Sequence, residues 1–341
     1  MTALKPLSTT SPALLCEVIR GDFVESLHAG HAVICDAEGQ VVRVWGDADV
    51  QVFPRSSCKM LQALPLLESG AADAAGLNDE ALALACASHN GAHIHTDRVG
   101  AWLKDLGMGD DDLRCGPQRP DDREARHEMI RTGASPCQVH NNCSGKHAGF
   151  LTLNRHLGGG TEYHEPDHPV QRAVREAFEE ETGETSPGYG IDGCSAPNFA
   201  TSLGGLARAM AKFAAPDESS VRGVAQQRLY EAMVTHPALV AGEGRACTGL
   251  MRAAKGRAAV KTGAEGVFVA ILPEQGLGVA LKVNDGTTRA SEAAIAAILV
   301  GLGVLEENDP EVQRLANAPL INRRGMTVGS VRAAQALRTG W

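Results

Sequence analysis

The sequence has few aromatic residues, no long apolar run and no concentration of positive charge. Aromatic side chains make up 4% of the 341 residues, so platforms that stack nucleic-acid bases are not expected. The net charge is −9 and no Lys/Arg cluster stands out, which argues against nucleic acid and anionic membranes as partners. No stretch approaches the roughly 20 apolar residues of a membrane-spanning helix, so we do not expect a membrane partner either.

The chain also lacks a secretory leader pattern and a C-x-x-C pair. Its first 18 residues, "MTALKPLSTTSPALLCEV", hold one early lysine and only a short apolar piece, so we expect a cytoplasmic protein. In a reducing compartment its nine cysteines are free thiols or metal ligands rather than disulfides. Three of them, Cys16, Cys35 and Cys86, lie in apolar runs and are expected to pack in the core.

The remaining pattern predicts strands at both ends of the chain and helices between them. Residues 13–53 hold short β-branched runs broken by "AGH" and "AEGQ", which predicts strands and a hairpin. From residue 59 apolar residues recur at helical spacing, and Asn78 is a predicted N-cap. Near residue 258 the sequence "EGVFVAILPEQGLGVALKVND" predicts a second hairpin.

Neither group of strands can bury its faces alone, so both must share one sheet. The fold class is therefore α/β (α+β), with an antiparallel sheet, flanking helices and a helical lobe. We expect residues 1–62 and 256–341 to form the sheet lobe and residues 63–255 the helical lobe. A cleft between two such lobes is the expected place for an active site.

The stretch "RSSCKM" places Ser56 three residues before Lys59, at the start of an apolar helical pattern. Residues i and i+3 share a helix face, and a helix start offers free N–H groups and a positive dipole end. A neutral Lys59 could take the proton of Ser56, while the N–H groups hold an oxyanion. S-x-x-K also arises by chance, in which case Ser56 is an N-cap and Lys59 is solvated.

A second motif, Lys261-Thr262-Gly263, stands directly before the predicted C-terminal hairpin. An S-x-x-K helix start with a late K-T-G strand is the pattern of serine β-lactamases and penicillin-binding proteins. The third element of that pattern, S-D-N, is absent from the sequence. The combination predicts the serine-β-lactamase-like fold with a different amide substrate, and it makes the hydroxyl of Ser88 a candidate for the same cleft.

Three further cysteines lie in glycine-rich loops, Cys143 in "HNNCSGKH", Cys194 in "GIDGCSAPNF" and Cys247 in "GEGRACTG". Cys143 and Lys146 share one face of a predicted helix. Zn²⁺ is the natural metal for thiolates, and a bound zinc favours the neutral amine that a lysine ligand needs. Scattered semi-buried thiols are the other interpretation, because the spacing matches no common zinc motif.

Six stretches together resemble the L-asparaginase II family, the class 3 asparaginases typified by thermolabile rhizobial enzymes. They are "PRSSCKMLQALPL", "ASHNGAHIHTDRV", "HNNCSGKHAGFL", "GIDGCSAPNF", "THPALVAGEGRACT" and "KTGAEGVF". The resemblance covers about residues 13–335. It implies a serine-β-lactamase-like fold, usually as a homodimer, that hydrolyses L-asparagine to L-aspartate and ammonia.

The resemblance also implies which residues form the site. It carries over two Ser–Lys pairs, Ser56 with Lys59 and Ser88 with Lys261, and three zinc ligands, Cys143, Lys146 and Cys194. Five residues are then candidates to bind the substrate or to support these groups: Arg55, whose guanidinium fork suits a carboxylate, Asp192, Cys247, His147 and Thr262. The run "NGAHIH" departs from the small and acidic residues usual there in the family, which leaves the local loop contacts open.

We expect Ser56 to be the nucleophile, Lys59 its general base, and Ser88 with Lys261 a second pair that passes protons. Two other functions stay open. A β-lactamase-like or penicillin-binding-like esterase lacks support from an S-D-N motif, and a non-catalytic zinc-binding module would release no ammonia. L-Glutamine is a rival substrate, because one methylene discriminates by only about 1–3 kcal/mol.

Overall fold

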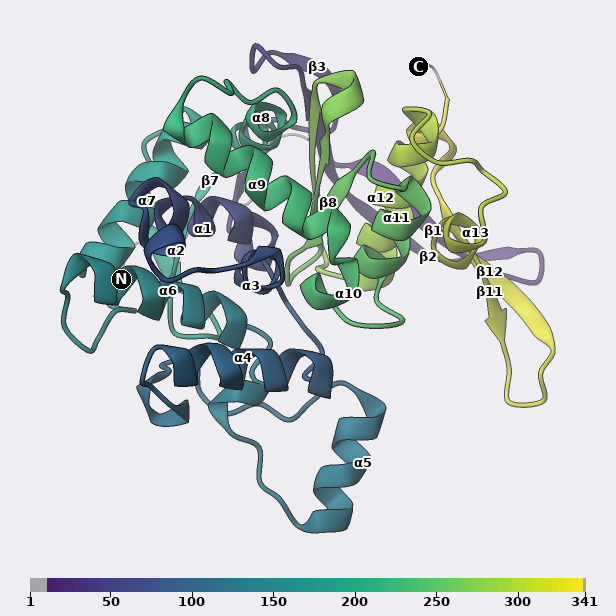
Figure 1. Ribbon diagram of the computed structural model, residues 1–341. Helices are drawn as coiled ribbons and strands as arrows, with labels where there is room; N and C mark the ends of the chain where they lie inside the picture. Colours follow the sequence, from purple (N-terminus) through teal and green to yellow (C-terminus); the bar gives the residue numbers. More distant parts are fainter. Residues whose placement is uncertain (1–10, 340–341) are drawn as a thin grey trace, which may run out of the picture.

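The computed structural model describes residues 11–339. It contains a large antiparallel sheet built from both ends of the chain, next to a body of helices (Figure 1). The eight strands include β3 (Val41–Trp45), which pairs with β2, and the order of the others is β11 (Asn317–Ile321), β12 (Thr327–Ala333), β1 (Ala13–Arg20), β2 (Phe23–Cys35), β10 (Leu277–Val283), β9 (Val267–Leu272) and β8 (Ala259–Thr262). The prediction of one sheet shared by the N- and C-terminal strands is confirmed.

Most helices come from the middle of the chain, as the periodicity predicts. They are α1 (Lys59–Glu68), α2 (Ala71–Ala74), α3 (Asp79–Ala85), α4 (His93–Asp105), α5 (Arg123–Thr132), α6 (Ser144–Leu157), α7 (Pro169–Thr182), α8 (Leu203–Ala214), α9 (Val221–Thr235), α10 (Pro237–Val240), α11 (Ala246–Ala254), α12 (Thr288–Gly301) and α13 (Pro310–Ala316). Short 3₁₀ turns are η1 (Arg55–Cys58), η2 (Asp110–Asp112), η3 (Gln138–His140), η4 (Pro273–Gln275) and η5 (Gln335–Leu337). The predicted N-cap of α3 is present, because Asn78 Oδ1 accepts the Ala81 N–H at 3.0 Å.

Two short strand pairs lie outside the large sheet. β4 (Gln51–Val52) pairs with β7 (Thr201–Ser202), and β5 (Tyr189–Ile191) pairs with β6 (Pro197–Phe199). The first pair joins the end of the N-terminal strands to the start of α8, while the turn between β5 and β6 contains Cys194. The β4–β7 pair therefore ties the start of α8 to the segment that leads into α1.

Strand β2 runs through the predicted break at "AGH" without interruption. A Cβ on Gly30 would lie 2.1 Å from the Lys282 carbonyl oxygen and 2.7 Å from Leu15 Cδ1. This glycine is therefore required by the close approach of the neighbouring strands rather than by a turn. The expectation that the strand breaks there is wrong, since a glycine between β-branched runs signals either a turn or a crowded backbone.

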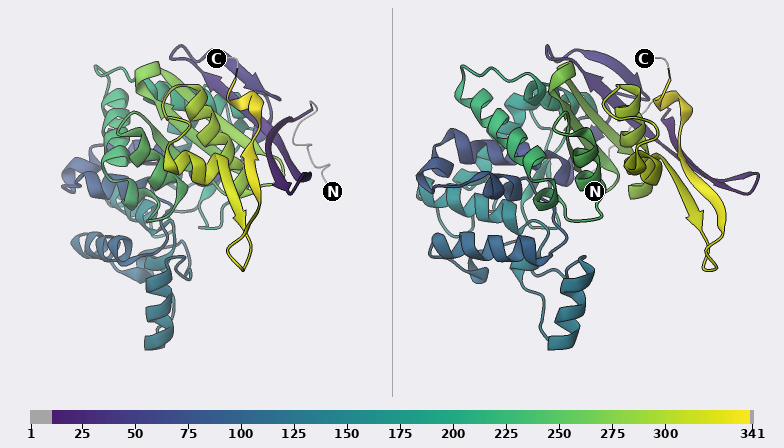
Figure 2. Two further views of the ribbon diagram at one scale, coloured as in Figure 1. Left: turned by 90° about the vertical axis from the view of Figure 1, so that its right-hand side faces the viewer. Right: turned by 45° about the vertical axis from the view of Figure 1, so that its right-hand side comes forward.

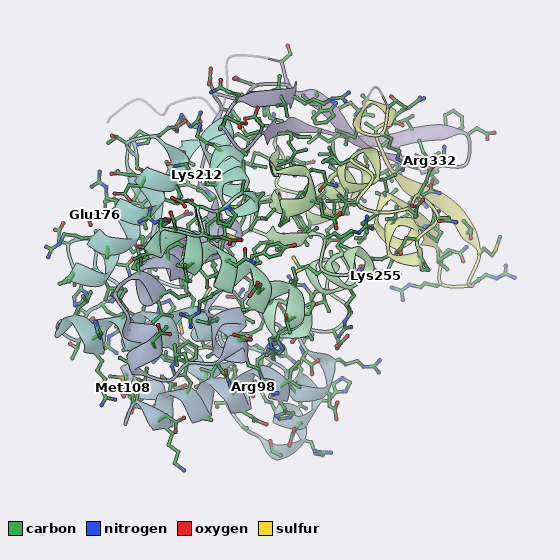
Figure 3. The ribbon with its side chains drawn as sticks, turned by 45° about the horizontal axis from the view of Figure 1, so that its top comes forward. Arg98, Met108, Glu176, Lys212, Lys255 and Arg332 are labelled. Atoms are coloured by element: carbon green, nitrogen blue, oxygen red, sulfur yellow. The ribbon has the colours of Figure 1, made fainter. Side chains whose placement is uncertain are left out.

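The core lies between the sheet and its helices. Helix α8 packs on β10, β2 and β9, and α12 packs on β1, β12, β9 and β10. The hairpins β1–β2 and β11–β12 are neighbours in the sheet and project from the body (Figure 2). Polar side chains such as Glu176, Lys255 and Arg332 lie on the surface (Figure 3).

No helix between residues 11 and 339 has both the length and the apolar character needed to cross a membrane. Residues 1–10 and 340–341 lie outside the described residues. They include the first part of the N-terminal stretch that lacks a secretory leader pattern, and the two outer ends of the predicted sheet lobe. The cytoplasmic location and the lobe boundaries stay predictions.

Candidate active site

Two buried lysines meet at one serine hydroxyl. Lys261 Nζ lies 2.8 Å and Lys59 Nζ 3.1 Å from Ser88 Oγ, and all three residues are at most 5% exposed. Lys59 begins α1, Ser88 follows α3 and Lys261 belongs to β8. The structure therefore brings the predicted pair of Ser88 and Lys261 together, and it adds Lys59 to that pair.

The glycine of the K-T-G motif lets β8 approach the start of α1. A Cβ on Gly263 would lie 2.5 Å from the Pro54 carbonyl oxygen and 3.1 Å from the Ser57 amide nitrogen. A side chain at this position would therefore push the strand away from turn η1. Because β8 is the last strand of the sheet, it is free to contact η1.

The hydroxyl of Ser56 is half-buried and makes no hydrogen bond within residues 11–339. It lies in the 3₁₀ turn η1, whereas Lys59 starts the regular helix α1. The Lys59 amine instead donates to the Ala87 carbonyl oxygen, Ser88 Oγ and Cys143 Sγ. Three acceptors use its three N–H groups, so the predicted pairing of Ser56 with Lys59 stays a prediction for the substrate complex.

Burial and a neighbouring positive charge both lower the pKa of Lys261. Removal of the amine from water, followed by the positive charge of Lys59, lowers the pKa of Lys261 to about 7. Near neutral pH this nitrogen therefore exists partly as a neutral amine, which can accept a proton. A proton acceptor thus lies within hydrogen-bonding distance of the Ser88 hydroxyl.

A second cluster contains the two predicted thiol ligands and another buried lysine. Lys146 Nζ lies 3.0 Å from Cys194 Sγ, and Lys59 Nζ lies 3.1 Å from Cys143 Sγ. Cys143 caps the start of α6, which also carries Lys146, and Cys194 lies in the turn between β5 and β6. Because Lys59 contacts both Cys143 and Ser88, it connects the thiol cluster to the serine cluster.

The pKa values of the two thiols shift in opposite directions. The hydrogen bond with Cys143, aided by the charge of Lys146, holds the pKa of Cys194 well below its usual value despite burial. The same hydrogen bond, together with burial, raises the pKa of Cys143. Burial alone would lower the pKa of Lys146, but the Cys194 thiolate raises it above its ordinary value. Cys194 and Lys146 are therefore a buried ion pair.

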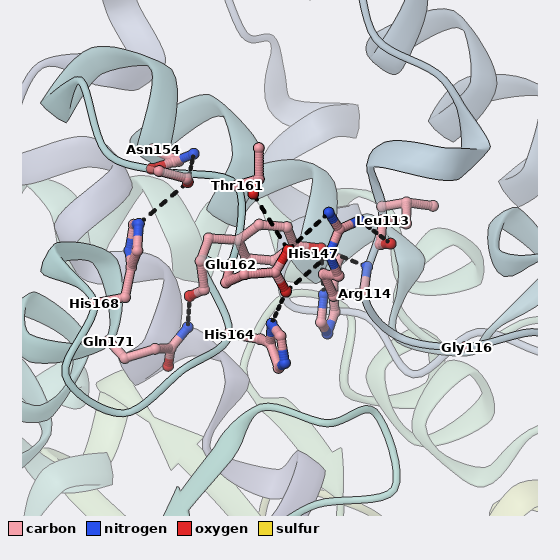
Figure 4. A network of polar contacts seen from close by, with 12 residues as sticks. Leu113, Arg114, Gly116, His147, Asn154, Thr161, Glu162, His164, His168 and Gln171 are labelled. Atoms are coloured by element: carbon pink, nitrogen blue, oxygen red, sulfur yellow. Dashed lines mark hydrogen bonds and ion pairs between the residues drawn. The ribbon is translucent and has the colours of Figure 1, made fainter.

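His147 follows Lys146 in α6 and is fully buried. Burial lowers its pKa to about 4, so the ring is neutral. Its Nδ1 lies 2.8 Å from the Tyr163 hydroxyl, which accepts the Arg114 N–H at 2.8 Å. The phenol therefore donates to Nδ1 and leaves the ring proton on Nε2, which is buried and has no hydrogen-bond partner among residues 11–339. The ion pair of Arg114 with Glu162 holds this segment in place (Figure 4).

The remaining candidates flank the two clusters. Arg55 donates its Nε and Nη2 groups to Asp192 Oδ1 at 2.9 and 2.7 Å, so most of its fork is already occupied. The Thr262 N–H donates to Cys247 Sγ at 3.3 Å, and burial raises the pKa of that thiol. Cys247 thus contacts the backbone of the K-T-G motif rather than the other two thiols.

The donor set at the second cluster fits zinc. Thiolates are ligands that Zn²⁺ prefers, and the lowered pKa of Cys194 favours its thiolate form. Within residues 11–339 no group of three or more His, Cys, Asp and Glu side chains is arranged for a metal, and the predicted set holds only two of these, with Lys146 as its third member. The zinc ligands therefore stay a prediction.

Sequence reasoning missed two residues of the site. Asn198 Oδ1 accepts the Arg55 amide at 3.2 Å, and Tyr163 fixes the tautomer of His147. Asn198 stands in "GCSAPNF" beside a predicted ligand, but it carries neither charge nor nucleophile. The only sequence signal for Asn198 is that a polar residue stands in an apolar stretch.

A comparison with known protein families shows to which family the chain belongs. A family model described as L-asparaginase II matches residues 16–333. The chain belongs to the L-asparaginase II family. Membership identifies it as a hydrolase and supports asparaginase activity in general. No curated protein matches the chain.

Several solved structures are similar at low identity. Mglu in its native form has 12% identity and a TM-score of 0.47, over 83% of this chain and 66% of its own length, so the chain spans less than two thirds of that protein. A β-lactamase from Mycobacterium bovis has 14% identity over 79% of this chain and 93% of its own, with a TM-score of 0.43. An octameric penicillin-binding protein homologue from Pyrococcus abyssi has 12% identity over 84% and 76%, with a TM-score of 0.37. We draw no functional conclusion from likeness at this level.

Proposed function

We propose that this protein hydrolyses L-asparagine to L-aspartate and ammonia through an acyl-enzyme on Ser56. The observation that supports this most is the Ser88 hydroxyl, held between the buried amines of Lys59 and Lys261. The unengaged hydroxyl of Ser56 lies in the turn that leads into Lys59. Ser56 is the more accessible serine and is therefore assigned as the nucleophile.

The buried amines can exchange one proton through Ser88. The Lys59 ammonium gives a proton to Ser88 Oγ, while Ser88 gives its own proton to the neutral amine of Lys261. Lys59 is then neutral and accepts the proton of Ser56 as its oxygen attacks the side-chain amide carbon. Backbone N–H groups at the start of α1 hold the oxyanion.

Ammonia leaves after Lys59 returns the proton to the amide nitrogen. The β-aspartyl ester on Ser56 is then hydrolysed by water, with the same amine as base. Both steps use the same proton path in opposite directions. The described residues and the attacking water therefore provide every group that these proton transfers need.

The thiol cluster would bind and orient the substrate. Cys143, Cys194 and Lys146 would hold Zn²⁺, which when bound supplies a positive charge that attracts the amino-acid end of the substrate. Lys146 would have to lose its proton to bind the metal. Arg55 keeps its Nη1 free for the α-carboxylate, and Asp192 keeps Oδ2 for the α-ammonium group.

The decisive assay is ammonia release from L-asparagine, with L-glutamine and a chromogenic β-lactam run in parallel, each with and without a chelator. We expect release from asparagine, and weaker release after the chelator. Turnover of the β-lactam alone would favour the esterase, and zinc binding without any ammonia would favour a binding module. Faster release from glutamine would reverse the substrate preference.

We also propose that the protein is a homodimer that forms through its projecting hairpins. Phe23 is 78% and Leu27 61% exposed on β1–β2, and Ile321 and Met326 are exposed on β11–β12. Exposed large apolar side chains on two neighbouring hairpins favour association. The charge of −9 keeps the rest of the surface soluble.

A further inference from the structure

The residue before Ser56 has an unusual backbone conformation. Arg55 has φ = +55°, a left-handed conformation that L-residues other than glycine, asparagine and aspartate rarely adopt. Such strain persists only where surrounding contacts enforce it, and it concentrates at functional sites. The backbone of Arg55 sets the direction in which the chain enters Ser56, so the contacts that hold Arg55 also place the Ser56 hydroxyl.

Two residues of the β5–β6 hairpin hold Arg55, whose carbonyl oxygen also accepts a hydrogen bond from Cys58 Sγ of its own turn at 3.3 Å. Asn198 Oδ1 in β6 accepts the backbone N–H of Arg55 at 3.2 Å. Asp192 Oδ1 accepts two N–H groups of its guanidinium. Asn198 is 5% exposed, so water cannot readily replace its oxygen. A backbone N–H buried without an acceptor is costly.

The hairpin is rigid enough to act as a support. Its strands pair from Tyr189 with Phe199 to Ile191 with Pro197. The turn is closed by the Asp192 N–H, which donates to the Ala196 carbonyl oxygen at 3.0 Å. Phe199 packs against Phe178 of α7. The position of Asn198 is therefore fixed by the helical body rather than by the segment that it holds.

We propose that Asn198 is a positioning residue for the reaction: its side-chain oxygen keeps Arg55 in the left-handed conformation that directs the Ser56 hydroxyl toward the substrate. This inference rests on the proposed role of Ser56 as the nucleophile. It also implies that one hairpin carries a thiol of the second cluster and sets the geometry of the serine. Asn198 does not touch the reacting atoms and acts through Arg55.

The test begins with Asn198→Ala, which removes the acceptor. We expect kcat for asparagine to fall about 100-fold, because a misplacement of about 1 Å costs that much, while KM changes much less, because Asp192 still holds the Arg55 guanidinium. Asn198→Asp keeps an oxygen acceptor and should restore kcat to within about tenfold of the wild type. Ile191→Ala, on the exposed edge of the same hairpin, is the control and should leave both constants unchanged.

The strain predicts a specific coupling. Arg55→Gly accepts a positive φ without cost, so Asn198→Ala added to Arg55→Gly should lower kcat less than about threefold further. A further 100-fold loss in that background would show that Asn198 acts by another route and would overturn the inference. Should Asn198→Ala not fold, Asn198→Ser, whose hydroxyl is too short to reach the Arg55 amide, takes its place with the same expectations.

A crystal structure of Asn198→Ala separates this inference from the proposed function. We expect φ of Arg55 to leave the left-handed region in the variant. If φ stays near +55°, the inference fails whatever the activity. If instead the wild-type protein releases no ammonia from asparagine but φ changes as expected, the proposed function fails while the structural role of Asn198 stands.

Discussion

Two buried lysines in this protein have the same burial and opposite acid–base behaviour. The pKa of Lys261 is lowered to about 7, whereas that of Lys146 is raised. Lys261 faces a neutral hydroxyl, and its charged neighbour is another ammonium. Lys146 faces a thiolate. Burial penalises the charged amine in both places, so the charge of the partner decides the outcome.

The largest expected effect separates the two serines. Ser56→Ala should lower kcat by about 10³-fold or more, because loss of a nucleophile leaves only binding and oxyanion stabilisation. Ser88→Ala should cost less, since it removes only the path between two amines. Ammonia release under saturating asparagine, with circular dichroism as a folding control, measures both. Near-normal turnover by Ser56→Ala together with an inactive Ser88→Ala would exchange their roles.

Replacing each lysine by methionine tests the comparison directly. Lys261→Met should lower kcat about 10²–10⁴-fold without loss of stability, because it removes an amine that burial disfavours. Lys146→Met should cost about 3–5 kcal/mol of unfolding free energy, since it leaves a buried thiolate unpaired. Chemical denaturation and kinetics of the matched pair give both numbers. Equal destabilisation of the two variants would contradict the assigned charges.

The pH dependence follows from the lowered pKa of Lys261. Activity requires its neutral form, so kcat/KM should rise about fivefold from pH 6 to pH 7 and about twofold more above pH 7, with an apparent pKa of about 7. Between pH 7 and 10.5 the unfolded chain binds a proton at this lysine that the folded chain does not, so its contribution to stability rises with pH there and is constant below. Lys261→Met should remove this slope from the unfolding free energy, and an unchanged slope would refute the shift.

Changing the second cluster should affect binding more than chemistry. Cys194→Ser should lower zinc content and raise KM for asparagine about tenfold, because it removes a thiolate from the predicted ligand set. Metal analysis by mass spectrometry and steady-state kinetics check this. If Cys194→Ser instead abolishes turnover while zinc stays bound, the thiol takes part in the chemistry.

The smallest effect on activity concerns the projecting hairpins. Phe23→Asp combined with Leu27→Asp should convert the dimer to a monomer in light scattering, with kcat within about twofold of the wild type. Both clusters are built from a single chain, so neither needs the partner. Loss of activity on dissociation would show that the interface shapes the site.

The sequence predicted some parts of the site better than others. The pairing of Ser88 with Lys261 followed from the resemblance to the L-asparaginase II family, while motif order only placed Ser88 as a candidate for the same cleft. The amine of Lys59 was placed by the i, i+3 rule, which assumes a regular helix. The actual 3₁₀ turn and the acceptors at Ala87 and Cys143, from distant elements, direct it elsewhere.

The strands show the same limit. Hairpin β9–β10 was predicted from two apolar runs and the turn residues between them. Strand β11 was not, since Pro319 interrupts its pattern, yet it is tolerated because β11 is the edge of the sheet. An edge position is a property of the assembled sheet and leaves no local mark.

The sequence by itself determined the family, the antiparallel sheet shared by the two ends of the chain, and the chemical types gathered in the site. These depend on short motifs and on hydrophobic periodicity, which are local. Only the tertiary structure decided which lysine loses its proton, where the Lys59 amine points and what holds Arg55 in its left-handed conformation. Those properties depend on burial and on the charges of groups that are distant in sequence, so they exist only after the chain has folded.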